Sequence, residues 1–301
     1  MNRGGVGRVP AARYSGAMEQ RRRTVAEGEI ATVEDWTAGP RAPLVHFAHA
    51  TGMAAGLYAS LVERLVGRVN VVASDARGHG ATMLPFDPAA LSDWSTFADD
   101  LAALLAMLPP APRLVLAGHS MGATVSAELA ARRDDVAALV LIEPAFVPFA
   151  VAAAYDRAAW PNPMAAQAAK RRAVWPSRAA MREAWVGRGV FATWADADLA
   201  RYLAYGVRDR ADGQVELACA PAWEAATFAA VSTGLEDALA AWGGPLTLLH
   251  ATERSTVTAE DAAAIAARPA TTVRAFPGRD HFLPLAEPQG MADAILAAAF
   301  A

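Results

Sequence analysis

The 301-residue sequence contains a single cysteine, Cys219, and no uninterrupted apolar stretch long enough to cross a membrane. One cysteine excludes an internal disulfide and a thiolate zinc cage, and we interpret Cys219 as a buried apolar residue. A membrane-spanning helix needs about 20 apolar residues, and prolines and charged residues interrupt the two most apolar stretches, at 109–113 and 143–148. We therefore expect a soluble, cytoplasmic protein with no membrane partner.

A basic patch is also missing, because the formal net charge is −4 and acids and bases are interspersed. This balance offers no electrostatic footprint for nucleic acid. The first 22 residues differ from the rest, since they are rich in arginine and glycine and contain one acid, Glu19. They lack the apolar core of a secretory signal, so we expect a disordered extension over residues 1–22. Met18 remains an alternative to Met1 as the start.

Short β-rich runs alternate with apolar-periodic helical segments along the chain. A hairpin is expected within 24–33, and strands at 44–50, 69–76, 113–118, 137–143, 245–251 and 271–276. Helices are expected at 57–66, 94–108, 120–132, 259–267 and 288–299. This alternation predicts the α/β class, with a mostly parallel twisted sheet covered by helices on both faces. Residues 23–144 and 245–301 form the predicted core.

The segment 145–244 is too long for a single connection between the fourth and fifth parallel strands. We interpret it as a helical cap that returns to the core, with one or two of its tryptophans in an apolar pocket. The five tryptophans are Trp160, Trp175, Trp185, Trp194 and Trp223. Five arginines keep an acidic substrate open, although most such charges are solvated: Arg171, Arg172, Arg178, Arg182 and Arg188.

The pentapeptide at 118–122, Gly-His-Ser-Met-Gly, follows an apolar run and precedes a helical segment. A strand that turns sharply into a helix around G-x-S-x-G exposes the serine hydroxyl, so Ser120 is the predicted nucleophile. A serine hydroxyl needs a base, and His281, in a loop after the last strand, is the candidate best placed to reach it. His119, inside the turn, should point away from the serine hydroxyl.

Four segments in order make the chain resemble the α/β-hydrolase superfamily, in particular capped serine hydrolases of the esterase or lactonase kind. They are 47–52, 74–80, 118–122 and 277–284. In the family these are the oxyanion loop, a D-x-R-G-H-G turn, to which we assign a structural role, the nucleophile elbow and the catalytic histidine loop. The resemblance implies an oxyanion hole formed by the N–H groups of Thr51 and Met121. Ala50 replaces the usual glycine, so Gly52 remains an alternative to Thr51.

The acid of the triad is where the sequence departs from the family. An aspartate is usual near positions 254–256, where this chain has Arg-Ser-Thr. Glu143 ends the preceding parallel strand, a position at which some relatives, notably those resembling haloalkane dehalogenases, carry their acid. An unpaired buried carboxylate is costly, so we expect Glu143 to pair with His281. Glu253 is the alternative acid, and a triad without an acid is the third possibility.

These residues predict a serine hydrolase that cleaves a small to medium carboxylic ester or lactone with an apolar part. The reaction would pass through an acyl-serine intermediate, with no metal and no organic cofactor. Carbon–carbon bond hydrolysis, perhydrolysis and a ligand-binding relative without catalysis are the alternatives. Epoxide hydrolases and dehalogenases of this fold need a carboxylate where Ser120 stands. The oligomeric state does not follow from the sequence, and a homodimer remains open.

Overall fold

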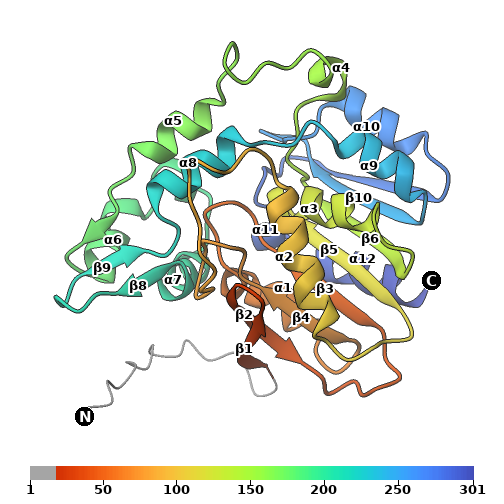
Figure 1. The fold of residues 1–301 in the computed structure, drawn as a ribbon, viewed down its shortest axis with the longest axis horizontal. Helices are drawn as coiled ribbons and strands as arrows, with labels where there is room; N and C mark the ends of the chain where they lie inside the picture. Colours follow the sequence, from red (N-terminus) through yellow and green to blue (C-terminus); the bar gives the residue numbers. More distant parts are fainter. Residues whose placement is uncertain (1–17) are drawn as a thin grey trace.

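The computed structural model describes residues 18–301, in which eight strands form one sheet in the order β1-β2-β4-β3-β5-β6-β10-β11 (Figure 1). β2 pairs antiparallel with β1 and β4, and every other neighbouring pair is parallel. The predicted mostly parallel sheet is therefore confirmed. The strands are β1 (Glu19–Val25), β2 (Gly28–Asp35), β3 (Leu44–Ala48), β4 (Asn70–Ser74), β5 (Leu114–His119), β6 (Val136–Ile142), β10 (Leu246–Ala251) and β11 (Thr271–Phe276).

Helices cover both faces of this sheet, because alternate residues of each central strand point to opposite sides. In β5, Val115 and Ala117 belong to one apolar cluster, and Leu114 and Leu116 belong to the other. The first cluster is completed by η1 (Ala55–Tyr58), α1 (Ala59–Val62), α11 (Leu283–Ala286) and α12 (Pro288–Phe300). The second is completed by α2 (Ser95–Ala106), α3 (Met121–Ala130), α9 (Leu235–Trp242) and α10 (Ala259–Ala266).

The predicted helix at 57–66 is wrong in its extent, because only one short turn, α1, is regular. Beyond it, Arg64 N–H and Leu65 N–H donate to the carbonyl groups three residues earlier, as in a 3₁₀ turn. These tighter turns leave Leu61, Val62 and Leu65 all buried. Within residues 18–301, no helix has both the length and the apolar character that crossing a membrane requires.

The chain enters the sheet earlier than the sequence predicted. Residues 1–17 of the predicted extension lie outside the described residues, but residues 19–22 belong to β1 and pair with β2. Arg21, one of the arginines that made this part look different, has its Nε atom 3.7 Å from Glu34 Oε2, and the next strand residue on the same face, Arg23, donates from Nε to Glu34 Oε1 at 2.7 Å. The Glu34 carboxylate is buried and needs a cationic partner.

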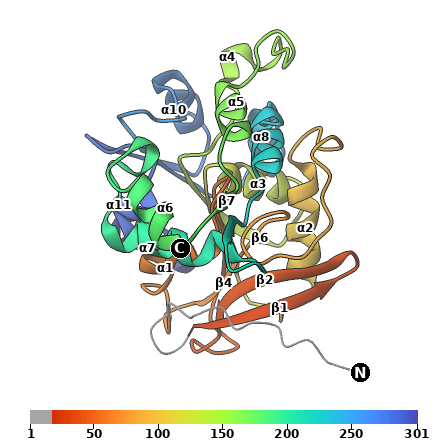
Figure 2. The ribbon, with the colours of Figure 1, turned by 90° about the vertical axis from the view of Figure 1, so that its left-hand side faces the viewer.

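The inserted segment, residues 145–244, contains more than the predicted helices. A small antiparallel sheet in the order β7-β9-β8 accompanies them, and its hairpin turn contains Asp212-Gly213, with Gly213 at φ 81°. Strands of two or three residues are too short to show alternation. Figures 1 and 2 show α5 and α8 side by side. The elements before α9 are α4 (Phe149–Ala152), α5 (Pro163–Ala169), β7 (Val174–Trp175), α6 (Arg178–Trp185), η2 (Gly189–Phe191), α7 (Asp196–Tyr205), β8 (Val207–Asp209), β9 (Val215–Leu217) and α8 (Pro221–Ala229).

Truncation of a sheet residue tests the packing of the second face. Leu116→Ala removes a fully buried side chain from the central strand, and we expect the free energy of unfolding to fall by about 2–5 kcal/mol. Met107→Ala is the control, because this side chain is 52% exposed and its loss should cost less than about 0.5 kcal/mol. Urea denaturation measures both, and equal losses would contradict this description of the core.

Candidate active site

Ser120 lies at the sharp turn between β5 and α3, where its backbone adopts φ 55° and ψ −121°. A positive φ is unfavourable for a residue with a side chain, so the surrounding structure must impose it. Ser120 N–H donates to Ile142 C=O at 3.0 Å, and Ala145 N–H donates to Ser120 C=O at 3.2 Å. A Cβ atom on Gly122 would overlap the backbone of Ala48 in β3. The predicted sequence of strand, sharp turn and helix is confirmed.

Glu143 directly follows β6, and its side chain is completely buried. Oε1 accepts hydrogen bonds from Ala251 N–H at 2.6 Å and from the Ser255 hydroxyl at 2.7 Å. Oε2 accepts from Thr256 N–H at 3.0 Å and lies 2.9 Å from His281 Nδ1. Burial by itself would raise the pKa of Glu143, but the hydrogen bond and attraction of His281, with the other donors, lower it to about 2. The carboxylate is therefore ionised at neutral pH.

The alternative acid, Glu253, is placed differently. Its side chain is exposed, and its backbone N–H donates to Arg279 C=O at 2.9 Å. Among the hydrogen bonds and ion pairs of residues 18–301, none joins Glu253 to His281. The loop without the expected aspartate instead supplies three donors to Glu143: the hydroxyl of Ser255, and the amide and hydroxyl of Thr256. The structure thus brings Glu143, and not Glu253, to the histidine.

The partner of His281 determines which ring nitrogen carries the proton. An ionised carboxylate only accepts hydrogen bonds, so Nδ1 of His281 donates to Glu143 and Nε2 is the acceptor of the neutral ring. The imidazole is 21% exposed, and it lines the same cavity as Ser120. Nε2 is therefore the atom of His281 that is available to a proton from that cavity.

A chain of hydrogen bonds connects His119 to two other loops. His119 Nε2 donates to the carbonyl oxygen of His281 at 2.8 Å, because a carbonyl cannot donate. Nδ1 is then an acceptor, and it receives the hydroxyl proton of Tyr58 at 2.8 Å. The Tyr58 oxygen accepts Ala50 N–H at 3.1 Å. Burial, reinforced by the nearby His281, lowers the pKa of His119 to about 3, so the ring is neutral, as this chain of bonds requires.

The loop after β3, residues 49–53 and hereafter the β3 loop, presents one amide to the cavity. Ala50 N–H donates to Tyr58, and Gly52 N–H donates to His79 Nε2 at 3.0 Å. Within residues 18–301, no hydrogen bond engages the N–H groups of Thr51 or Met121. Thr51 lines the same cavity as Ser120. Met121 directly follows Ser120 as the first residue of α3, where backbone donors have no helical partner. The contacts thus favour Thr51 over Gly52 as the free donor.

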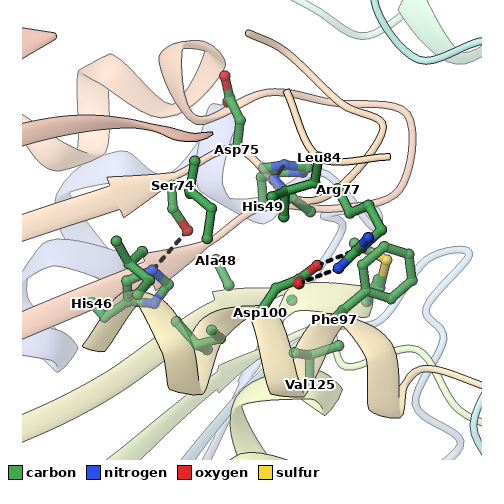
Figure 3. A pocket seen from close by; sticks show the side chains of 16 residues that line it. His46, Ala48, His49, Ser74, Asp75, Arg77, Leu84, Phe97, Asp100 and Val125 are labelled. Carbon is green, nitrogen blue, oxygen red and sulfur yellow. Dashed lines mark hydrogen bonds and ion pairs between the residues drawn. The ribbon is translucent and has the colours of Figure 1, made fainter. Parts of the chain in front are cut away.

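The turn at 75–80 supports the β3 loop from the side of β4. A small cavity of about 40 Å³ lies there, between the His46–Ser74 hydrogen bond of 2.9 Å and the Arg77–Asp100 ion pair (Figure 3). Arg77 donates to both carboxylate oxygens of Asp100, at 2.9 and 2.6 Å. Burial lowers the pKa of His79 to about 3, so His79 stays neutral and accepts Gly52 N–H. These contacts agree with the structural role predicted for the turn.

A cavity of about 790 Å³ lies over Ser120 and His281, within the size range of small-molecule sites. The core and the inserted segment both line it. Of the five tryptophans of the inserted segment, one lines the cavity, Trp185, which agrees with the predicted one or two. Trp94, from the core, also lines it and was not predicted. From the inserted segment come Ala145, Phe146, Asn162, Met164, Gln167, Ala168, Arg171, Trp185, Gly189, Val190, Phe191, Tyr202, Glu224, Phe228 and Val231.

One further prediction concerns a residue outside this cavity. Cys219 is buried, as expected, and burial raises the pKa of its thiol. Within residues 18–301, no three histidine, cysteine, aspartate or glutamate side chains are grouped as metal ligands would be.

Two curated proteins resemble parts of the chain. Protein phosphatase methylesterase 1 of Gibberella zeae is 32% identical over 98 residues, which make up 31% of this chain and 24% of that protein. A 2-(acetamidomethylene)succinate hydrolase of Mesorhizobium japonicum is 34% identical over 115 residues, which make up 38% of this chain and 39% of that protein. The similarity thus spans less than half of either relative.

The overall fold is shared with a crystal structure of E-2-(acetamidomethylene)succinate hydrolase. The superposition has a TM-score of 0.77 and covers 94% of this chain and 100% of that chain, at 23% identity. The family model described as serine aminopeptidase, S33, matches residues 39–283. Its range includes the β3 loop, the turn that carries Ser120, Glu143 and His281. The chain therefore belongs to the serine aminopeptidase S33 family, within the α/β-hydrolase superfamily.

Proposed function

We propose that this α/β-hydrolase is a serine hydrolase that cleaves a small to medium carboxylic ester or lactone with an apolar part. The observation that carries the proposal is the 2.9 Å hydrogen bond between His281 Nδ1 and the buried carboxylate of Glu143, beside a cavity that also contains Ser120. An imidazole oriented by a carboxylate is the base that turns a serine hydroxyl into a nucleophile.

In the first half of the reaction, Ser120 Oγ attacks the carbonyl carbon while Nε2 of His281 accepts the hydroxyl proton. The free N–H groups of Thr51 and Met121 donate to the developing oxyanion. Glu143 stabilises the imidazolium through Nδ1. The bond between the carbonyl carbon and the alcohol oxygen then breaks, His281 returns the proton to that oxygen, and an acyl group remains on Ser120.

In the second half, water replaces the alcohol. Its oxygen attacks the acyl carbon as Nε2 of His281 takes one of its protons, and the same two amides stabilise the second oxyanion. The bond to Ser120 Oγ breaks, the serine recovers its proton from His281, and the carboxylic acid leaves. A lactone follows the same steps, but the alcohol remains attached to the acid product.

The inserted segment acts in this proposal as a cap that supplies the apolar part of the binding site. Met164, Trp185 and Phe228 line the cavity from this segment, and Trp94 lines it from the core. Burial of apolar substrate surface against such side chains contributes about 25 cal/mol per Å². The partial similarity to a methylesterase supports an ester as the bond that is cleaved.

Substitution of the proposed triad tests the mechanism with p-nitrophenyl butyrate as substrate. Ser120→Ala should abolish hydrolysis, because no acyl-enzyme can form. Glu143→Gln should lower kcat by about 10⁴-fold, because an amide does not stabilise the imidazolium or hold the required tautomer. Glu253→Gln is the matched control and should leave kcat unchanged, since this side chain is exposed.

A loss of activity in Glu253→Gln and not in Glu143→Gln would reverse the assignment of the acid. Activity that survives in Ser120→Ala would exclude an acyl-serine. Wild-type protein that hydrolyses no ester of any chain length would refute the proposed bond type. Carbon–carbon bond cleavage, perhydrolysis and ligand binding would then be the reactions and roles to test.

The depressed pKa of Glu143 predicts a dependence of stability on pH. In the folded protein this pKa is about 2, against an ordinary value of 4.5. A carboxyl group whose pKa is lowered by folding stabilises the fold above its unfolded pKa, and this stabilisation is lost as the pH falls toward the folded pKa. The full loss corresponds to about 3 kcal/mol in the free energy of unfolding.

We therefore expect the free energy of unfolding of the wild type to fall more steeply than that of Glu143→Gln between about pH 5 and pH 3. Glutamine does not titrate, so the difference in slope isolates this one carboxyl group. Urea denaturation at a series of pH values measures it. Parallel curves for the two proteins would show that Glu143 is not held in its ionised form by the fold.

A further inference from the structure

We propose that the cavity selects uncharged esters and rejects those that carry a carboxylate, because Glu224 already neutralises the one arginine that the inserted segment places there, Arg171. This inference rests on the proposed function and specifies its substrate class. It also answers a question that the sequence left open, since five arginines of this segment could have formed a site for an acidic substrate.

Arg171 is held by two neighbours from other helices. Its Nη1 donates to Glu224 Oε2 at 2.5 Å, and its Nη2 donates to the Tyr202 hydroxyl oxygen at 2.9 Å. The side chain of Arg171 is 25% exposed and that of Glu224 is 8% exposed. Burial raises the pKa of Tyr202, so the phenol is uncharged at neutral pH. The cluster formed by these three residues thus contains one positive and one negative charge.

The other four arginines are committed elsewhere or lie on the surface. Arg172 stacks on Trp175 with its Cζ atom 4.5 Å from the ring centre. Arg178 pairs with Asp209 and Arg182 pairs with Asp196, and both acids are exposed. Arg188 is exposed. None of these four is among the described residues that line the cavity.

The second charged pair of the cavity is also internally neutral. Arg254 Nη2 lies 2.7 Å from Asp280 Oδ2. Among residues 18–301, the charged side chains that line the cavity are therefore two arginines and two acids, each arginine paired with an acid, in addition to His281. An anionic substrate would lose its hydration in this cavity without gaining an uncompensated cation.

Glu224 also lies close to the reacting centre. A Cβ atom built on Gly52 would be 2.5 Å from Glu224 Oε1, so this carboxylate packs directly against the β3 loop, next to Thr51. A substrate carboxylate near this position would lose hydration beside an arginine that Glu224 already engages, and it would gain no free cation in return. Because Arg171 pairs with Glu224, the carboxylate repels the oxyanion that forms beside Thr51 less strongly than an unpaired carboxylate would.

Two esters of the same shape test this selection. They are the mono-p-nitrophenyl ester of adipic acid, which carries a free carboxylate, and its analogue with a carboxamide in place of that carboxylate. We expect the wild type to favour the carboxamide in kcat/KM by on the order of tenfold or more. Binding of both esters to Ser120→Ala, measured by calorimetry, should show the same preference independently of hydrolysis.

Glu224→Gln should reduce or reverse the preference by on the order of tenfold, because it leaves the Arg171 charge free to bind the carboxylate. Glu216→Gln is the matched control, since Glu216 pairs with Arg210 on the surface of the same segment at 2.6 Å, and it should keep the wild-type ratio. The wild-type comparison decides the inference even if Glu224→Gln does not fold.

Equal or better binding of the carboxylate by Ser120→Ala, or binding of neither ester, would overturn the inference. An unchanged ratio in folded Glu224→Gln would overturn the role of Glu224. If Ser120→Ala binds the carboxamide preferentially but the wild type hydrolyses neither ester, the selectivity stands and the proposed reaction fails.

Discussion

The buried carboxylate of Glu143 joins four parts of the chain that meet at the carboxyl edge of the sheet. It directly follows β6, and its donors come from the end of β10, from the loop that follows β10, and from His281 after β11. A buried charge without such donors would be very unfavourable. The same requirement that keeps Glu143 ionised therefore fixes the loop at 255–256 and the orientation of the imidazole ring.

The serine side of the site depends on neutral rings in a comparable way. His119 and Tyr58 connect the turn that carries Ser120 to the β3 loop and to the backbone of His281. His79 holds Gly52 from the other side of the β3 loop. His79 Nε2 and His119 Nδ1 accept hydrogen bonds, so both rings must be neutral. Burial lowers the pKa of each histidine and keeps the rings neutral. These contacts engage the N–H groups of Ala50 and Gly52, while among residues 18–301 no hydrogen bond engages those of Thr51 and Met121.

The inserted segment contributes one wall of the cavity. Its helices bring Arg171, Tyr202 and Glu224 from three separate elements to one wall of the cavity. Because the two charges cancel, the wall is polar without attracting an ion of either sign. An arginine in a pocket is thus insufficient evidence for an acidic substrate, since its partner decides what charge the substrate meets.

The sequence by itself determined the strands of the core, because alternation and apolar runs are local properties of the chain. It also determined the turn around Ser120, since glycines at 118 and 122 are needed wherever a strand turns so sharply, and it favoured Glu143 because a glutamate ending an apolar strand needs a partner. Only the tertiary structure decided that Thr51 N–H is free and Gly52 N–H is not, that Ser255 and Thr256 serve Glu143, and that Glu224 neutralises Arg171. It also decided the three short strands of the inserted segment and the limited extent of the helix at 59–62. The hydrogen bonds of Gly52, Glu143 and Arg171 depend on residues far apart in the chain, and such contacts leave no periodic signal in the sequence. The three strands and the helix at 59–62 are too short for a periodicity to show.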